Sequence, residues 1–173
     1  MNIALQGTGP VSSGETSPLI AMTPGPARIL SSSASRGWHG ILLERHLTSP
    51  GERTAASIDK HVISMVTGAP AHFERRTEEG MFVAGFARPG TLTLTPAGPV
   101  PDIRLATPTE FIHCALELDF IGAVMSGLGG EPLPAPVFRA GFQDKSIQHL
   151  LGLLTEELES ERPLGRLYVE SLA

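Results

Sequence analysis

Short apolar runs separated by Gly and Pro occupy the middle of the chain. Three of them follow Gly80, at Met81–Phe86, Thr91–Thr95 and Phe111–Leu116. Runs of four to eight residues bounded by turn residues are typical of β-strands. Residues 91–95 alternate strictly between Thr and Leu, which places two leucines on one face of the strand and three threonines on the other.

Three similar runs come earlier, at Ile41–His46, His61–Val66 and Ala71–Thr77. The last of them is followed by Glu-Glu-Gly, which predicts a hairpin into the next strand. Pro89-Gly90 supplies the fixed φ and then the positive φ of a type II turn. About seven strands with regular turn signals predict a sandwich or a barrel.

After Leu118 the period of the pattern changes from two residues to that of a helix. We expect a short helix from Phe120 to Leu128 and a longer one from Asp144 to Ser160, with Asp144 as its N-cap. The apolar stripe of the longer helix consists of Ile147, Leu150, Leu151, Leu154 and Leu158. A third helix is expected to begin near Leu164 and to reach Ala173 after hardly two turns, as an element cut short.

The start of the chain has a different composition. Residues 1–35 are rich in Gly, Ser, Thr and Pro, and little in them could bury enough apolar surface to offset the entropy of ordering. The expected organisation is a flexible N-terminal arm over 1–36, a β-barrel over 37–118 and a helical segment over 119–173.

Composition narrows the class of protein. The length of 173 residues fits one domain, and 41% apolar residues with a mean hydropathy of +0.08 fit a globular protein. A formal charge of −5 argues against this chain alone binding a polyanion. Cys114 is the only cysteine, so no internal disulfide can form. With no signal-peptide pattern and no apolar run of membrane-spanning length, we expect a cytoplasmic protein without a membrane partner.

Several of these features together carry a resemblance. The segments RPGTLTLTPAG (88–98), EFIHCALELD (110–119), the leucine-striped helix and GRLYVESLA (165–173) resemble the N-terminal effector-binding and dimerisation domain of AraC-family transcriptional regulators. The resemblance covers roughly residues 38–173. It implies a mainly β fold with α: a cupin-like double-stranded β-helix, or jelly-roll barrel, followed by a C-terminal helical hairpin.

The resemblance also implies partners. A small-molecule effector would bind in the barrel, and DNA would be contacted only through a C-terminal helix-turn-helix domain that is not in this chain. A homodimer would form through the helices, whose apolar stripes exceed what the barrel can cover. The residues expected at that interface are Leu150, Leu151, Leu154, Leu158, Leu167 and Tyr168.

Candidate effector-binding residues lie mostly on the strands. In sugar-responsive members of the resembling family, the position of His113 contributes a ring to the pocket, and Phe111 shares its strand face. A half-buried histidine bonded to a neighbouring strand or to Glu117 is the alternative for His113. Arg53 lies where the family places a polar ligand contact, and the alternative is an ordinary arginine exposed on the surface. The remaining candidates are Phe82, Ile63 and Ile103, and for Phe82 and Ile63 a core position is the alternative.

Metal chemistry has little support in the sequence. Cupin enzymes hold their metal with an H-x-H motif plus Glu and a later His, but none of the six histidines here is spaced as H-x-H. The position after Pro96-Ala97-Gly98 where that later His often falls is Pro101. The Arg75-Arg76 pair is interpreted as part of a solvent-exposed hairpin and not as a nucleic-acid patch. We therefore expect no metal, no cofactor and no catalytic residues.

Two functions remain open. The first is the sensory and dimerisation domain of an AraC-type regulator. The alternative is a small cupin-fold enzyme, of the isomerase or dioxygenase kind, with a degenerate metal site. The third helix separates them, because a regulator would continue it beyond Ala173 into a linker and an enzyme would have no need to.

Overall fold

The structure, a computed structural model, describes residues 17–127, 134–161 and 163–172. Within these ranges lie twelve strands, one short 3-10 helix and three α-helices. The strands are β1 (Ala27–Ser32), β2 (Ile41–Thr48), β3 (Gly51–Arg53), β4 (Ala56–Ile58), β5 (His61–Val66), β6 (Ala71–Arg76), β7 (Phe82–Ala87), β8 (Leu92–Thr95), β9 (Gly98–Val100), β10 (Ile103–Leu105), β11 (Thr109–Leu116) and β12 (Arg139–Phe142).

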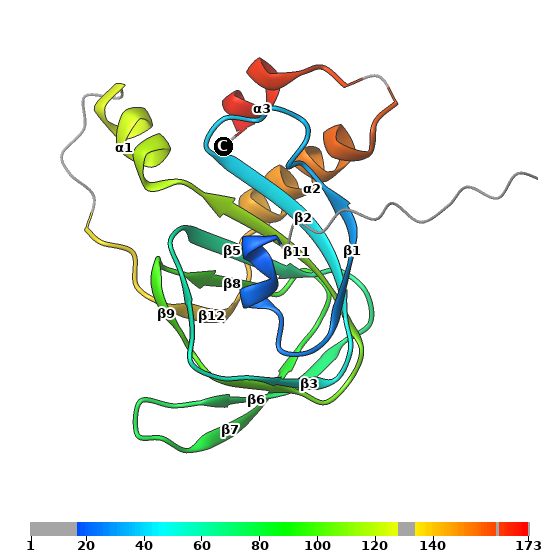
Figure 1. The fold of residues 1–173 in the computed structure, drawn as a ribbon, viewed down its shortest axis with the longest axis vertical. Helices are drawn as coiled ribbons and strands as arrows, with labels where there is room; N and C mark the ends of the chain where they lie inside the picture. Colours follow the sequence, from blue (N-terminus) through cyan, green and yellow to red (C-terminus); the bar gives the residue numbers. More distant parts are fainter. Residues whose placement is uncertain (1–16, 128–133, 162, 173) are drawn as a thin grey trace, which may run out of the picture.

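The chain from β2 to β11 is one long antiparallel hairpin. Outward from the turn between β6 and β7, β5 pairs with β8, β4 with β9, β3 with β10 and β2 with β11. The hairpin is rolled up, because β11 also pairs with β5 and β10 with β6. Two main sheets result, in the orders β1-β2-β11-β5-β8-β12 and β3-β10-β6-β7, and β4 with β9 forms a third sheet of two strands (Figure 1). This is a jelly roll, the topology of the expected cupin-like barrel.

The main strands lie where the apolar runs predict them. The bounds of β5 coincide with the predicted ones, and those of β2, β6, β7, β8 and β11 differ by two residues at most. The turn at Pro89-Gly90 is also confirmed: Gly90 has φ +85°, and the amide of Thr91 donates to the carbonyl of Arg88 at 2.9 Å. The short strands β3, β4, β9 and β10 were not predicted, because three residues carry too little pattern.

The expected flexible arm over 1–36 is wrong for its described part. Residues 1–16 lie outside the described residues, but a 3-10 helix, η1 (Pro18–Met22), and β1 follow them. Leu19 is fully buried and Met22 nearly so, in a cluster with Val62 and Ala115. Since β1 pairs with β2 and β12 pairs with β8, the barrel extends beyond both of the boundaries expected at 37 and 118.

Three α-helices follow the barrel: α1 (Leu118–Gly127), α2 (Lys145–Glu159) and α3 (Arg166–Leu172). The three helices lie where they were expected, although α1 begins two residues before Phe120 and α3 two residues after Leu164; the expected ends at Leu128 and Ala173 lie outside the described residues. Asp144 caps α2 by accepting from the amides of Ser146 and Ile147. None of the described helices is both long and apolar enough to cross a membrane.

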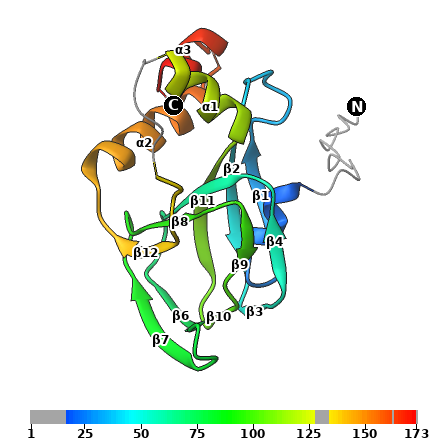
Figure 2. The ribbon, with the colours of Figure 1, turned by 90° about the vertical axis from the view of Figure 1, so that its left-hand side faces the viewer.

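Helix α2 packs on the outer face of the six-stranded sheet (Figure 2). Leu151, Leu154 and Leu158 are each 2–3% exposed, in one cluster with Leu43, Ile112 and other strand residues. These three leucines therefore cannot form the dimer contacts expected of them, because the barrel of the same chain already covers them. Of the other three residues expected there, Leu150 and Tyr168 are half-buried and Leu167 is 82% exposed.

The leucines of the alternating strand β8 face outward, toward the helices. Leu92 belongs to the cluster beneath α2, whereas Thr93 and Thr95 point into the barrel. The central strands of this sheet are thus covered on both faces, the outer face by helices and the inner face, which carries both polar and apolar residues, by the rest of the barrel. The largest apolar cluster of the protein therefore lies between the sheet and α2, outside the barrel, and the interior of the barrel can hold polar side chains.

Candidate functional site in the barrel

A row of polar side chains crosses the inner face of the six-stranded sheet. Strand pairing sets Glu44 of β2 opposite His113 of β11, His113 opposite Ser64 of β5, and Ser64 opposite Thr93 of β8. Residues opposite one another in a ladder project to the same side. The register of four strands therefore gathers these groups inside the barrel.

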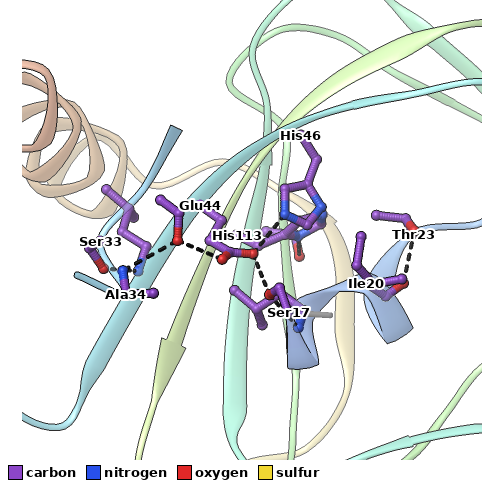
Figure 3. A network of polar contacts seen from close by, with 12 residues as sticks. Ser17, Ile20, Thr23, Ser33, Ala34, Glu44, His46 and His113 are labelled. Carbon is purple, nitrogen blue, oxygen red and sulfur yellow. Dashed lines mark hydrogen bonds and ion pairs between the residues drawn. The ribbon is translucent and has the colours of Figure 1, made fainter. Parts of the chain in front are cut away.

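Glu44 is the centre of a buried hydrogen-bond network (Figure 3). Its carboxylate accepts from the hydroxyls of Ser17 at 2.6 Å and Ser32 at 2.7 Å, and from Nε2 of His46 at 2.8 Å. Burial by itself acts to raise the pKa of Glu44, but the hydrogen bonds from His46, Ser17 and Ser32 outweigh it and hold the pKa below its ordinary value. Glu44 is therefore a carboxylate, fully engaged by its neighbours.

His113 lies beside this network with one nitrogen engaged and one free. Its Nδ1 is 2.8 Å from the hydroxyl of Ser64, its ring stacks on Phe111 at 5.5 Å, and the ring of His46 meets it edge-on at 5.1 Å. Burial, together with repulsion from His46 and Arg53, places the pKa of His113 well below 6.5, so the ring is neutral at pH 7. Its Nε2 is buried and has no hydrogen-bond partner within the described part of the chain.

A cavity of about 110 Å³ lies between the two sheets, with His113, Ser64 and Thr93 on one wall. The other wall belongs to the four-stranded sheet, where Arg53 of β3, Ile103 of β10 and Arg75 of β6 stand side by side in register. A cavity of about 150 Å³ holds benzene, so this somewhat smaller space admits only a small ligand.

Arg53 closes one side of the cavity. Its guanidinium donates to the carbonyl oxygens of Met22 and, at 2.8 Å, of Pro101. Burial lowers the pKa of Arg53 to about 10, with the charge of Asp102 acting in the opposite direction, so the side chain is still a cation at pH 7. Its Nε has no hydrogen-bond partner among the described residues.

Four of the six residues expected to bind a ligand line this one cavity: His113, Phe111, Arg53 and Ile103. The other two do not. Ile63 points to the helix-covered face and packs against the cluster beneath α2. Phe82 lies on the outside of β7, where the guanidinium of Arg104 sits 3.8 Å from its ring centroid. Ile63 thus has the core position that was its alternative, whereas Phe82 lies neither in the cavity nor in a core cluster.

Sequence reasoning missed several cavity residues. Arg75 was assigned with Arg76 to a solvated hairpin, but only Arg76 is outside, paired with Asp102 at 3.1 Å. Successive residues of a strand face opposite sides, so alternation itself separates these two arginines. Ser64 and Thr93 were missed because strand register brings them beside His113.

A metal site finds no support in this geometry. Within the described ranges, no three or more His, Cys, Asp or Glu side chains are grouped so that they could hold a metal ion. Cys114 points away from the cavity into the cluster beneath α2, and burial raises the pKa of its thiol to about 12.

No protein-family model matches this sequence, and no curated protein matches it. Among solved structures, a tryptophan variant of oxalate decarboxylase from Bacillus subtilis aligns with 71% of this chain at 15% identity and a TM-score of 0.40. A deletion mutant of the Bacillus subtilis enzyme aligns with 73% at 14% identity and a TM-score of 0.39. This chain spans only 38–40% of those proteins. At such values the likeness supports no conclusion about function, and the jelly-roll topology rests on the strand pairing itself.

Proposed function

We propose that this barrel is the effector-binding domain of an AraC-type transcriptional regulator. The observation that supports the proposal most is the cavity between the sheets, which is lined by His113, a residue whose buried Nε2 has no hydrogen-bond partner among the described residues. Leaving a buried polar atom unpaired costs about 1–3 kcal/mol, and a ligand that bonds to it removes that cost. A binding site therefore explains why this wall is polar.

The coupling that a regulator needs has a short route here. On strand β11, His113 faces the cavity while its neighbours Ile112 and Cys114 face the cluster that holds α2. A ligand that shifts His113 acts on a strand whose other face carries the helix. This arrangement supports a sensor, because binding inside the barrel and packing of the helices outside share one sheet.

A second candidate is a small cupin-fold enzyme, favoured by one observation. A carboxylate hydrogen-bonded to a histidine, as Glu44 is to His46, is an arrangement that acid–base catalysis uses. Neither of these two residues is among those that line the cavity, and the histidine that does line it, His113, is neutral. The sensor is preferred for that reason.

The test begins with a thermal-shift screen of small metabolites, because a ligand at 100 times its dissociation constant adds about 2.7 kcal/mol of stability. For any compound found, His113→Gln should weaken binding about tenfold or more, since a hydrogen bond inside the cavity is lost. His149→Gln, at an exposed position on α2, is the matched control and should leave affinity unchanged.

Two results would contradict the proposal. One is an affinity unaffected by His113→Gln while the free energy of unfolding falls, which would make His113 purely structural. The other is chemical conversion of the bound compound, followed by NMR, which would favour the enzyme.

A further inference from the structure

We propose that the ligand of this cavity is a small monocarboxylate with an apolar body, whose carboxylate lies between Arg53, Arg75 and His113. The inference rests on the proposed function, which it extends by naming the chemical class of the ligand. It follows from the charges of the walls, from the unpaired groups on them and from the apolar lining around them.

The charge of the cavity is opposite to the charge of the protein. The chain carries 18 acidic and 13 basic residues, yet the described residues that line the cavity include two arginines and neither Asp nor Glu. A low-dielectric pocket lined by charges of one sign attracts the opposite sign. An anion is therefore the ligand charge that this pocket favours.

Arg53 is a cation without a counter-ion among the described residues. Its hydrogen bonds go to the carbonyls of Met22 and Pro101, which are neutral. Asp102, whose charge acts on Arg53, is itself bonded to Arg76 at 3.1 Å and accepts from the amide of Ala55 at 3.0 Å. Burying a charge without a partner is costly, so an anionic ligand next to Arg53 would stabilise this wall.

Arg75 stands in the same row, two strands away. Both arginines are register partners of Ile103, so their Cα atoms lie about 10 Å apart, at about 4.8 Å for each strand spacing. The guanidinium of Arg75 rests 5.2 Å from the ring centroid of Phe138, and it forms no ion pair with a described residue. Two long side chains flanking one isoleucine can converge on a carboxylate above it.

His113 completes the set from the opposite sheet. If the hydroxyl of Ser64 donates to Nδ1, the neutral ring carries its proton on Nε2, the atom without a partner. That N–H is an unpaired donor of a residue in the cavity wall, and a carboxylate that reaches it would be its acceptor. The three groups thus present donors only, which distinguishes a carboxylate from an ammonium ligand.

The remainder of the cavity selects the body of the ligand. Phe73, Phe111 and Phe138 line it together with Ile103 and Leu105. Its volume of about 110 Å³ excludes long chains and polycyclic molecules. A single ring or a short alkyl chain is what these side chains accommodate.

Isothermal titration calorimetry with the whole chain tests the inference. Benzoate and hexanoate are the probes, benzamide and hexanamide their uncharged counterparts, and benzylamine the cationic one. We expect at least one carboxylate to bind saturably and about tenfold or more tighter than its amide, and benzylamine not to bind.

Variants assign the binding to the two arginines. Arg75→Gln should weaken carboxylate binding about tenfold or more and leave amide binding unchanged, and Arg53→Gln should do the same. Arg53 also donates hydrogen bonds to two backbone carbonyls. If Arg53→Gln does not fold, the carboxylate affinity of Arg75→Gln alone tests the inference. Arg28→Gln removes the same charge from an exposed position on β1, away from the cavity, and should change nothing.

Three results would overturn the inference. They are an amide that binds as tightly as its carboxylate, a carboxylate whose affinity survives Arg75→Gln, and the absence of binding by both carboxylates. If a neutral compound from the thermal-shift screen nevertheless binds in a His113-dependent way, the carboxylate is wrong and the proposed function stands. If no compound binds at all, both fail.

Discussion

His113 connects the interior of the barrel with the helix packed outside it. Its ring is 3% exposed and lies against His46 and Phe111, while its backbone belongs to a strand that supports α2 on the other side. A neutral imidazole is suited to such a place, because a charged one would have to be desolvated beside Arg53. The stability of the folded protein therefore depends on the protonation state of His113, and so on pH.

The stability of the protein should fall more steeply with acid because of His113. Its pKa is well below 6.5 in the folded state, so below pH 6.5 the unfolded chain takes up a proton that the folded chain excludes. Stability is unaffected above that value and is lost as pH falls.

Urea unfolding from pH ~7.5 to ~5 measures this effect. Because the Gln side chain of His113→Gln does not titrate, the free energy of unfolding of this variant should fall less with acid than that of the wild type. Parallel curves for wild type and His113→Gln would show that His113 accepts a proton in the folded protein.

Which residues share the site could be predicted only in part. The resemblance pointed to His113, Phe111 and Arg53, and Ile103 was also a candidate. Alternation shows that a strand has two faces, but not which face is inside. Here the apolar face of β8 is turned outward and is covered by helices, so the threonines, which looked like the exposed set, line the cavity.

At the scale of elements, α2 belongs to the barrel. Besides its leucines, Arg36 donates to the carbonyl of Leu158 at 2.7 Å near the end of the helix, and the buried Glu157 accepts from the amide of Gly165 at 2.8 Å. The first contact ties α2 to the loop after β1, and the second ties it to the start of α3. The helix is thus fixed at its face and at its end.

Truncating the α2 stripe should therefore destabilise the monomer. Leu151→Ala removes a side chain that is 2% exposed, and such a change costs about 2–5 kcal/mol. Leu167→Ala, at 82% exposure on α3, should cost about 0.5 kcal/mol at most. Denaturant unfolding of both variants measures the difference. Similar small losses would mean that α2 is only loosely attached to the sheet.

Most strands and helices could be located from the sequence, but the pairing of the strands could not be predicted from it. Runs such as His61–Val66 carry enough apolar residues to be recognised alone. Strand β1 (ARILSS) reads as polar and follows Pro-rich sequence, and it becomes a strand because β2 offers it a free edge. The sequence also does not show which surface the apolar stripe of α2 contacts, since such a stripe can pack on the barrel as well as on a partner subunit.

For the whole molecule, we propose a homodimer that uses a smaller surface than the helices suggested. Leu164 and Leu167, which are 73% and 82% exposed, lie beside and on α3, and large exposed leucines often mark a contact between proteins. Two-fold pairing is the commonest arrangement.

Light scattering between about 1 and 100 μM tests this pairing. The wild type should form dimers in that range, and a variant with Leu164→Asp and Leu167→Asp should be monomeric with an unchanged free energy of unfolding. Val137→Asp, at another exposed apolar position, is the control. A wild type that is monomeric at about 100 μM, well above the 1 μM that corresponds to −8.2 kcal/mol, would refute the dimer.

The nested pairing of the strands divides the molecule into two interlocking halves. The turn between β6 and β7 includes Glu78, Glu79 and Gly80, all exposed. If the chain were cleaved there, only β1 with β2 and β8 with β12 would pair within one piece, and every other ladder would join the two.

Neither piece alone would have a binding site. Ser64, Arg53 and Arg75 belong to the first piece, and His113 and Ile103 to the second. A nicked protein would therefore hold together by strand pairing, and a ligand bound in the cavity would strengthen the association of the two pieces by the factor with which that association strengthens ligand binding.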